Sequence, residues 1–368
     1  MSTPLVALDA RLTRQMSVGM KAYVRELVAR LPAQAADLQF LVFSNEELQV
    51  SAPNARLVRV SAFTAQNGAI GEQLVYPGQL RRSAPDLIHY MSVYAPRRSQ
   101  LAHVYTIHDL IHLRFPKYFS WKVPPYYRLI VGPVARSARA VITDASATIA
   151  DLSQFLGVAP ERARVIPLGV AATFSLDDDE RTHLAGQARL RFGLERPYFL
   201  YAGNHRPHKN LQTLCEAWYD LLALPCDLVV TGDGPLGYLS ARGKKTNGKL
   251  HLTGHVDVED LVSLYAGCVA SVQPSLYEGF GLSVLEAMAS GAPAIVAQTP
   301  ALLEVGGDAV ASFPPTDAAA LAAIMTLVLS NVDEASRLRS AGRDRVRAFS
   351  WDATARATAD VYRQALRS

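Results

Sequence analysis

The chain has 368 residues, enough for two domains of ordinary size that each bury a core of their own. Hydrophobic residues make up 49% of the chain and charged residues 19%, which indicates a folded globular protein and argues against a long disordered region. The net charge of +4 is spread along the chain, so the composition argues against nucleic acid as a partner.

The cysteines and the hydropathy indicate the compartment. Cys215, Cys226 and Cys268 are an odd number without C-x-x-C spacing, which speaks against a disulfide framework or a zinc site and favours a reducing cytoplasm. No apolar run approaches the roughly 20 residues needed to span a bilayer, and the first residues do not resemble a secretion signal. We therefore expect a cytoplasmic protein that touches a membrane only from its surface, on the inner face.

The first half of the chain alternates short apolar runs with longer helical patterns, which is typical of βαβ units. The predicted strands cover residues 5–8, 40–43, 87–90, 104–107 and 140–143, and the predicted helices cover residues 20–31, 70–82, 126–138 and 146–156. This alternation predicts one parallel sheet covered by helices, in a first domain of residues 1–175.

The second half repeats the alternation after an acidic stretch, residues 177–180, that is interpreted as a linker. Predicted strands cover residues 198–202, 228–231, 270–273 and 294–297, and helices begin near residues 210, 258, 282 and 317. These elements predict a second parallel sheet, in a domain of residues 176–351. The helical patterns over residues 333–348 and 352–366 have no strand between them, so we expect the terminal helix, residues 352–368, to join the first domain.

The most informative segment runs from Pro274 to Ala289, where a predicted strand is followed by glycines and a helix. Glycines at a helix start leave backbone N–H groups bare, and these groups with the helix dipole make an anion site suited to a phosphate. Glu278 lies just ahead of this helix and Glu286 lies inside it, so both carboxylates can flank one ligand and accept hydrogen bonds from sugar hydroxyls. The alternative is a helix cap at Glu278 and a solvated helix residue at Glu286, and the combination with the glycines argues against it.

This segment resembles the family 4 retaining glycosyltransferases of GT-B fold, whose hallmark is two glutamates separated by seven residues. The resemblance implies an α/β protein of two Rossmann-like, doubly wound parallel-sheet domains facing a central cleft. It also implies that Glu278 contacts the donor hexose, that Glu286 binds the ribose hydroxyls, and that the backbone between them holds the phosphates through Gly279, Phe280, Gly281 and Leu282.

A second segment, residues 201–211, again joins a strand, a glycine turn at Gly203 and a helix. A cation here can lie against a diphosphate and stabilise the charge that develops as the sugar leaves, and Lys209 is the residue we choose. The family often places an arginine one residue after the glycine, where this chain has Asn204, which leaves Arg206 as the candidate for a second positive charge. The alternative is that Lys209 is only a helix-start residue with an exposed tip.

In the first domain, His108 and Asp109 follow a predicted strand, where the ligand-facing loops of such sheets lie. The pair resembles the His-Asp pair that lines the donor sugar in mannosyltransferase-like members of the family. The resemblance implies that His108 contacts the sugar near its reactive carbon and that Asp109 orients His108 or helps to receive the acceptor proton. Without that context, a lone histidine in such a loop is more often a structural hydrogen-bonding group.

Three further matches to the family are looser. Gly19, at the end of the polar loop over residues 10–19, matches a glycine-rich loop that approaches the phosphates. Val256 follows a segment that precedes a loop beside the nucleotide base, so the resemblance implies that Val256 packs there. Residues 118–128 mix aromatic side chains with positive charge, which suits a lipid headgroup layer or a lipid-linked acceptor, although ordinary packing is the favoured interpretation.

The resemblance implies a retaining, metal-independent hexosyltransferase without a cofactor other than its nucleotide-diphosphate sugar. The favoured donor is GDP-mannose, ahead of rhamnose and glucose donors, and the favoured acceptor is a hydroxyl of a glycan or lipid-linked saccharide in surface polysaccharide or lipopolysaccharide assembly. Because fold does not fix reaction, a nucleotide-sugar epimerase or a sugar phosphorylase on the same architecture is the alternative, and a non-catalytic sugar-nucleotide binder is a third reading.

Overall fold

The computed structural model describes residues 3–11, 16–50, 52–61, 71–221, 224–234 and 248–367. These residues form two compact units: unit 1 takes residues 1–169 and 350–368, and unit 2 takes residues 170–349. The boundaries expected from the sequence are residues 175 and 351. Part of the loop expected over residues 10–19 and the first residue of the helix expected over residues 70–82 lie outside the described residues.

Unit 1 is built on a sheet in which the seven described strands all pair in parallel. In spatial order the strands are β3 (Ala55–Arg59), β2 (Gln39–Ser44), β1 (Leu5–Asp9), β4 (Leu87–Tyr90), β5 (His103–Thr106), β6 (Ala140–Thr143) and β7 (Ala163–Val165). The strand order reverses between β1 and β4, which makes the sheet doubly wound and creates a topological switch point at the carboxyl ends of these two strands.

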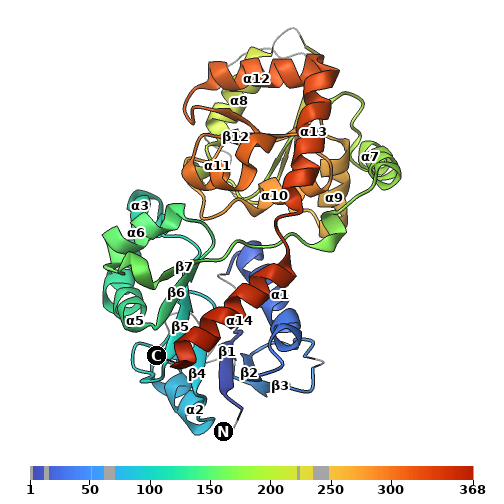
Figure 1. Cartoon of the computed structure of the whole chain (residues 1–368). Helices are drawn as coiled ribbons and strands as arrows, with labels where there is room; N and C mark the ends of the chain where they lie inside the picture. Colours follow the sequence, from blue (N-terminus) through green and yellow to red (C-terminus); the bar gives the residue numbers. More distant parts are fainter. Residues whose placement is uncertain are drawn as a thin grey trace. The chain divides into compact units, whose positions relative to one another are not determined.

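Helices cover both faces of this sheet (Figure 1). They are α1 (Val18–Gln34), α2 (Tyr76–Arg82), α3 (Ile111–Arg114), α4 (Val123–Tyr126), α5 (Gly132–Ser137), α6 (Ala147–Leu156) and α14 (Trp351–Arg367), with π-helical turns η1 (Gly71–Val75) and η3 (Tyr127–Val131) and 3₁₀ turns η2 (Pro116–Tyr118) and η4 (Pro160–Arg162). The single helix expected over residues 126–138 is therefore a succession of α4, η3 and α5.

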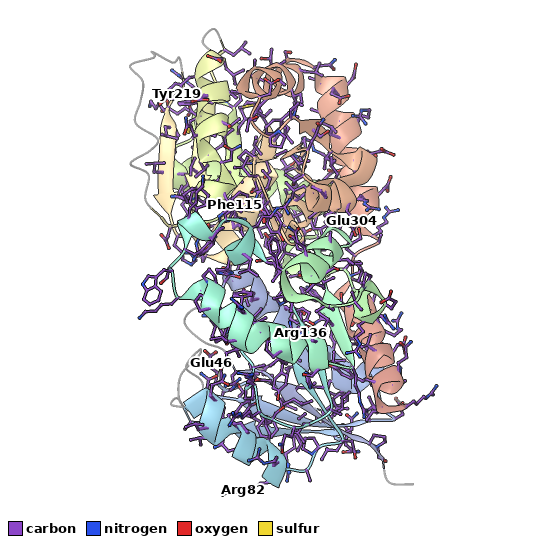
Figure 2. The ribbon with its side chains drawn as sticks, turned by 90° about the vertical axis from the view of Figure 1, so that its left-hand side faces the viewer. Glu46, Arg82, Phe115, Arg136, Tyr219 and Glu304 are labelled. Carbon is purple, nitrogen blue, oxygen red and sulfur yellow. The ribbon has the colours of Figure 1, made fainter. Side chains whose placement is uncertain are left out.

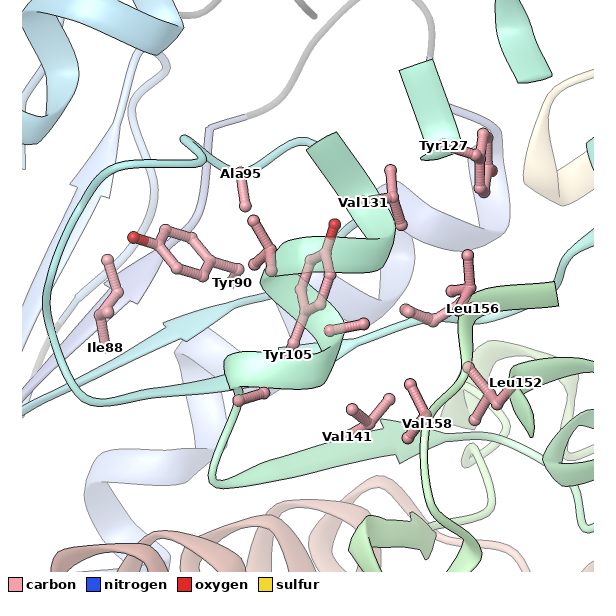
Figure 3. Close-up of a cluster of buried hydrophobic side chains, with 14 of the residues drawn as sticks. Ile88, Tyr90, Ala95, Tyr105, Tyr127, Val131, Val141, Leu152, Leu156 and Val158 are labelled. Carbon is pink, nitrogen blue, oxygen red and sulfur yellow. The ribbon is translucent and has the colours of Figure 1, made fainter. Parts of the chain in front are cut away.

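Alternate residues of the strands supply the two faces of the sheet. On one face, Tyr90 and Tyr105 pack with Val131 of η3 and Leu152 of α6 in a fully buried core (Figure 3). The central strands are apolar along their length because both faces of the sheet are covered, as expected of a parallel sheet.

On the opposite face, the C-terminal helix α14 packs on α1 and is tied to the sheet by a buried chain of hydrogen bonds. Tyr362 of α14 bonds His89 Nδ1 at 2.6 Å, His89 Nε2 bonds Thr106 Oγ1 at 2.7 Å, and Thr106 Oγ1 bonds the hydroxyl of Tyr23 in α1 at 2.9 Å. All four side chains are buried. This chain explains why residues so late in the sequence belong to unit 1.

Unit 2 has a second doubly wound sheet, with six parallel strands in the part of the chain that is described. In spatial order the strands are β10 (Leu250–Gly254), β9 (Asp227–Thr231), β8 (Tyr198–Ala202), β11 (Ala270–Gln273), β12 (Ala294–Ala297) and β13 (Ala311–Phe313). Its switch point lies between β8 and β11. The fold class expected from the sequence, two parallel-sheet α/β units, is confirmed.

The helices of unit 2 pack on both faces of its sheet: Phe199 and Tyr201 contribute to one core, and Tyr198 and Leu200 to the other. They are α7 (Asp178–Phe192), α8 (Leu211–Asp220), α9 (Val258–Gly267), α10 (Leu282–Ala289), α11 (Pro300–Gly306), α12 (Ala318–Ser330) and α13 (Val332–Val346), with 3₁₀ turns η5 (Ala172–Phe174), η6 (Pro207–Lys209) and η8 (Gly307–Ala309).

The interpretation of residues 177–180 as a linker is wrong, because these residues begin α7. Asp177 accepts a hydrogen bond from the Glu180 amide and the Glu180 side chain accepts one from the Asp177 amide, which is a capping box. Asp178 and Asp179 fall in the first turn, where negative charge complements the helix dipole. A run of acids that looks like a solvated linker is here a helix start.

Among the described residues, no single helix is long and apolar enough to cross a bilayer. One pair, residues 318–330 with residues 332–367, meets the length and composition criteria only together, and it is bent by 98°.

The contact between Gly169 and the start of α14 gives a stability prediction. A Cβ added at Gly169 would lie 2.1 Å from the amide nitrogen of Trp351, which backbone atoms cannot tolerate without moving. Gly169→Ala should therefore lower the free energy of unfolding by about 1–3 kcal/mol, measured by urea denaturation.

The matched control is Gly186→Ala in α7, where an added Cβ meets nothing within 4 Å. Because alanine favours the helix over glycine, this variant should gain about 0.5–1 kcal/mol. Wild-type stability in Gly169→Ala would contradict the tight packing of α14 on unit 1.

Candidate active site

The site in unit 2 is assembled by two loops that follow neighbouring strands. Because β8 and β11 are parallel and adjacent at the switch point, the loops after them leave from the same edge of the sheet. The loops are joined directly: the Leu276 amide donates to the His208 carbonyl oxygen at 2.8 Å, and Asn210 Nδ2 donates to the Pro274 carbonyl oxygen at 3.0 Å. This arrangement brings together residues that are far apart in the sequence.

Lys209 and Glu278, which are 69 residues apart, form a buried ion pair at this edge. Lys209 Nζ lies 2.6 Å from Glu278 Oε1 and 2.9 Å from Oε2, and only 14% and 13% of the two side chains is exposed. Both residues are expected from the sequence to contact a ligand, and the structure shows that they also contact each other. In this position Lys209 is held in place, with one of its three protons left for another acceptor.

Two residues that the sequence did not reveal as candidates complete the surroundings of Glu278. Gln273 Nε2 donates to Glu278 Oε1 at 2.8 Å and Ser275 Oγ donates to it at 2.6 Å. Burial by itself raises the pKa of Glu278, but the Lys209 ammonium and the donors on Ser275 and Gln273 outweigh it and hold this pKa below its usual value. Among the described residues Oε2 accepts only from Lys209, so it keeps capacity for a hydroxyl.

The start of α10 presents unpaired backbone amides. Gly281 caps this helix with φ +115°, a conformation that favours glycine, and a Cβ there would also lie 2.8 Å from Leu302 Cδ2. The Phe280 ring is buried against Phe349, which fixes the chain just before the helix. Within the described residues, the N–H groups of Phe280, Gly281 and Leu282 have no acceptor. These amides and the helix dipole favour an anion at this position.

Glu286 lies inside α10 and is half-buried, and no hydrogen bond to its carboxyl group is found among the described residues. Burial raises the pKa of Glu286 to about 8. Because hydroxyl donors stabilise the ionised form of a carboxyl group, a ligand that supplies them would lower this pKa again.

The remaining residues selected in unit 2 lie in the loops after β8, β10 and β11. Gly203, with φ +152°, packs closely on Gly232, since a Cβ at Gly232 would lie 2.0 Å from the Gly203 carbonyl oxygen. Arg206 is exposed, and its amide donates to Asn204 Oδ1 at 3.3 Å. Val256 is half-buried against the core of unit 2. Gly279 lies between Glu278 and Phe280 and is half-buried.

In unit 1, the loop after β5 places His108 beside the carboxyl end of β6. His108 Nδ1 bonds Asp144 Oδ2 at 2.7 Å, and the Tyr23 ring meets the imidazole edge-on, with ring centroids 4.7 Å apart. His108 Nε2 is buried without a hydrogen-bond partner among the described residues. Burial lowers the pKa of His108, but the Asp144 carboxylate outweighs that effect and leaves this pKa above its usual value.

The expectation that Asp109 orients His108 is therefore wrong, because Asp144 forms the hydrogen bond that orients the imidazole ring. The Asp109 carboxylate instead accepts a hydrogen bond from the Ile111 amide at 3.0 Å, at the start of α3. Asp144 follows a predicted strand 36 residues later, and its position at the end of a strand is the signal that could have found it. Gly19 lies in the first turn of α1, where Ser17 Oγ accepts from the Met20 amide at 3.3 Å.

Among the described residues, no group of three or more His, Cys, Asp or Glu side chains is placed so that it could hold a metal ion. Cys215, Cys226 and Cys268 are buried free thiols.

Two family models match this chain. The model described as "Glycosyl transferases group 1" matches residues 187–345, within unit 2, and the model described as "Glycosyltransferase Family 4" matches residues 18–174, largely in unit 1. The chain belongs to the family-4-like glycosyltransferases of GT-B fold.

Individual relatives agree with this assignment. O-antigen chain mannosyltransferase B of Escherichia coli is 28% identical over 293 residues, which cover 75% of this chain and 74% of the relative. MMP α-(1→4)-mannosyltransferase of Mycolicibacterium hassiacum is 31% identical over 242 residues, which cover 63% of this chain and 56% of the relative. HepE from Anabaena, solved in complex with UDP and glucose, shares the fold with a TM-score of 0.73 and 17% identity over 98% of this chain and all of its own.

The bond between His108 and Asp144 predicts how the histidine titrates. Asp144→Asn removes the neighbouring negative charge, so the pKa of His108 should fall, measured by NMR titration of the imidazole. Asp109→Asn is the matched control and should lower this pKa less, because Asp109 does not bond the ring. An equal or larger fall in Asp109→Asn would contradict the pairing.

The raised pKa of Glu286 predicts that the stability of the protein depends on pH. Its pKa rises from 4.5 to about 8 on folding, so its proton-linked contribution to stability is complete below pH 4.5 and is lost as the pH rises through 8. Glu286→Gln has no such proton, and its Tm relative to wild type should rise between pH 5 and pH 9, by about 2 °C or more. Glu259→Gln, an exposed glutamate of α9, is the control. A Tm difference for Glu286→Gln that stays constant with pH would refute this account.

Proposed function

We propose that this glycosyltransferase is a retaining, metal-independent hexosyltransferase that moves mannose from GDP-mannose to a hydroxyl of a glycan or lipid-linked saccharide. The observation that carries the proposal is the buried Lys209–Glu278 pair beside the unpaired amides at the start of α10. A cation, an anion site and carboxylates at one sheet edge are the groups that a diphosphate with a sugar at each end requires. No cofactor besides the donor is part of this proposal.

Each selected residue of unit 2 has a role in donor binding. The amides of Phe280, Gly281 and Leu282 hold the diphosphate, and Lys209 stabilises the charge that grows on it as the sugar–phosphate bond breaks. Glu278 Oε2 accepts from a hexose hydroxyl, and Glu286 accepts from the ribose hydroxyls. Gly203 and Gly279 let the backbone approach the ligand, Arg206 supplies a second positive charge, and Val256 packs beside the base.

In unit 1, His108 acts on the transferred sugar through Nε2, the nitrogen that Asp144 leaves free. Asp109 is a candidate for receiving the acceptor proton, and Gly19 is proposed as a backbone contact of the phosphates. Mannose as the sugar is supported by the names of the Escherichia coli and Mycolicibacterium relatives, and a nucleoside diphosphate by the UDP bound to HepE. The acceptor is proposed from the O-antigen relative: surface polysaccharide or lipopolysaccharide assembly, on the cytoplasmic side of a membrane.

Two substitutions test the donor site. Glu286→Ala should weaken binding of GDP-mannose by about 10- to 100-fold, because hydrogen bonds to a charged group are lost, as measured by calorimetry. Lys209→Ala should lower kcat by about 100-fold or more, because one stabilising charge on the leaving group is lost. Glu259→Ala and Lys249→Ala, at exposed positions of unit 2, are the controls. Undiminished binding and turnover in both site variants would overturn the assignment.

Product analysis separates the proposed reaction from its alternatives. Proton NMR of the product should show the anomeric configuration of the donor, and an inverted linkage would contradict retention. Incubation of the donor without acceptor should leave it unchanged. Epimerised sugar or phosphate-dependent turnover would instead favour an epimerase or a phosphorylase on this fold.

A further inference from the structure

The connection between β5 and β6 has an unusual charge distribution. Residues 110–143 contain no aspartate or glutamate, although Asp109 and Asp144 stand immediately on either side. The same residues carry six cations: Arg114, Lys117, Lys122, Arg128, Arg136 and Arg139. The segment from Phe115 to Arg136 can be followed in Figure 2 through its cyan and green ribbon.

Half of these cations have partners inside the protein. Arg114 pairs with Asp151 at 3.2 Å, Arg136 donates to the Leu156 carbonyl oxygen at 2.7 Å, and Arg139 donates to the Ala365 carbonyl oxygen. In contrast, Lys117, Lys122 and Arg128 are exposed and form no ion pair with any described residue. These three positive charges are therefore available to an external anion.

Large apolar side chains stand among these free cations. Trp121 is 78% exposed, Leu129 is 55% exposed, and Tyr118 is 36% exposed. The Lys117 ammonium lies 5.0 Å from the centre of the Tyr118 ring, and the Lys122 ammonium lies 5.8 Å from the centre of the Trp121 ring. We call these six residues, Lys117, Tyr118, Trp121, Lys122, Arg128 and Leu129, the aromatic–basic surface.

A groove of about 500 Å³ continues this surface, since Arg128 and Leu129 also line it. Its other walls include the apolar side chains of Leu113 and Phe155 and the guanidinium group of Arg136. Exposed apolar side chains rimmed by cations, next to a groove lined by both apolar side chains and guanidinium groups, match an amphiphile with a negatively charged head.

We propose that the aromatic–basic surface docks unit 1 on an anionic phospholipid bilayer, with Trp121 at the headgroup boundary and Lys117, Lys122 and Arg128 on lipid phosphates. A tryptophan prefers this boundary, where its ring is in an apolar layer and its N–H is wet, and cations near an anionic leaflet gain attraction. A nucleic acid would use the cations but not the exposed leucine and the apolar side chains that line the groove, so the bilayer fits more of the surface.

The docking extends the proposed function. Its biological purpose, which is to reach a lipid-linked acceptor, rests on that function. The surface lies on the chain segment that directly joins His108 to Asp144, so docking it brings this part of unit 1 to the layer in which a lipid-linked acceptor resides. Binding to vesicles needs neither donor nor acceptor, so it can succeed or fail independently of the transferase activity.

The tryptophan content allows a direct test with the whole protein. The chain has three tryptophans, of which Trp218 and Trp351 are 3% and 4% exposed, so Trp121 is the one that solvent reaches. With vesicles of phosphatidylglycerol and phosphatidylcholine, Trp121 emission should shift to the blue and the protein should co-sediment. Both effects should weaken with added salt and be absent with pure phosphatidylcholine.

Substitutions in the aromatic–basic surface test whether this surface is responsible for vesicle binding. Trp121→Ala should weaken vesicle binding about tenfold, and Lys117→Gln with Lys122→Gln should weaken it by about the same factor or more. The controls remove comparable groups elsewhere: Leu190→Ala, an 87% exposed leucine of α7, and Arg56→Gln with Lys249→Gln. They should bind as wild type does.

Three results would overturn the proposal. They are the absence of binding to anionic vesicles, equal binding to neutral ones, and wild-type binding in both surface variants. If vesicle binding is present but the purified protein transfers no sugar, the docking stands and the proposed function fails.

Discussion

The ion pair between Lys209 and Glu278 is the interaction on which the candidate donor site depends. Removing two charges from water is costly, and a buried pair is tolerated only when its geometry is good and its remaining hydrogen bonds are satisfied. Here Lys209 contacts both carboxylate oxygens, and Gln273 and Ser275 donate to one of them. The pair can form only if β8 and β11 are neighbours, so the winding of the sheet determines the chemistry at its edge.

The parts of the fold that could be predicted from the sequence are those with one dominant physical signal. Central strands such as β8 and β12 are buried on both faces and appear as continuous apolar runs. The edge strands β3 and β10 were not predicted, because they are only half-buried and their apolar residues are interrupted. The acids of residues 177–180 were misread since a capping box and a linker share a composition.

The candidate site shows the same division. The glycines and glutamates around α10 are close in sequence, so their spacing was enough to select them. The partners of these residues are set by strand order: Asp144 reaches His108 only because β5 and β6 are adjacent, and Tyr23 reaches it from α1. Behind this pair, His89 joins the C-terminal helix to the sheet, and burial lowers its pKa to about 3 and keeps it neutral. No local pattern reveals such long-range contacts.

The central claim is that the edge of the unit 2 sheet, at Lys209, Glu278 and the start of α10, binds the diphosphate of a nucleotide sugar. The most direct measurement is a crystal structure of the protein with bound GDP. The account predicts phosphate oxygens within hydrogen-bonding distance of the Gly281 and Leu282 amides and of Lys209 Nζ, with the ribose on Glu286. A diphosphate bound elsewhere, with these amides and Lys209 left in contact with solvent, would contradict it.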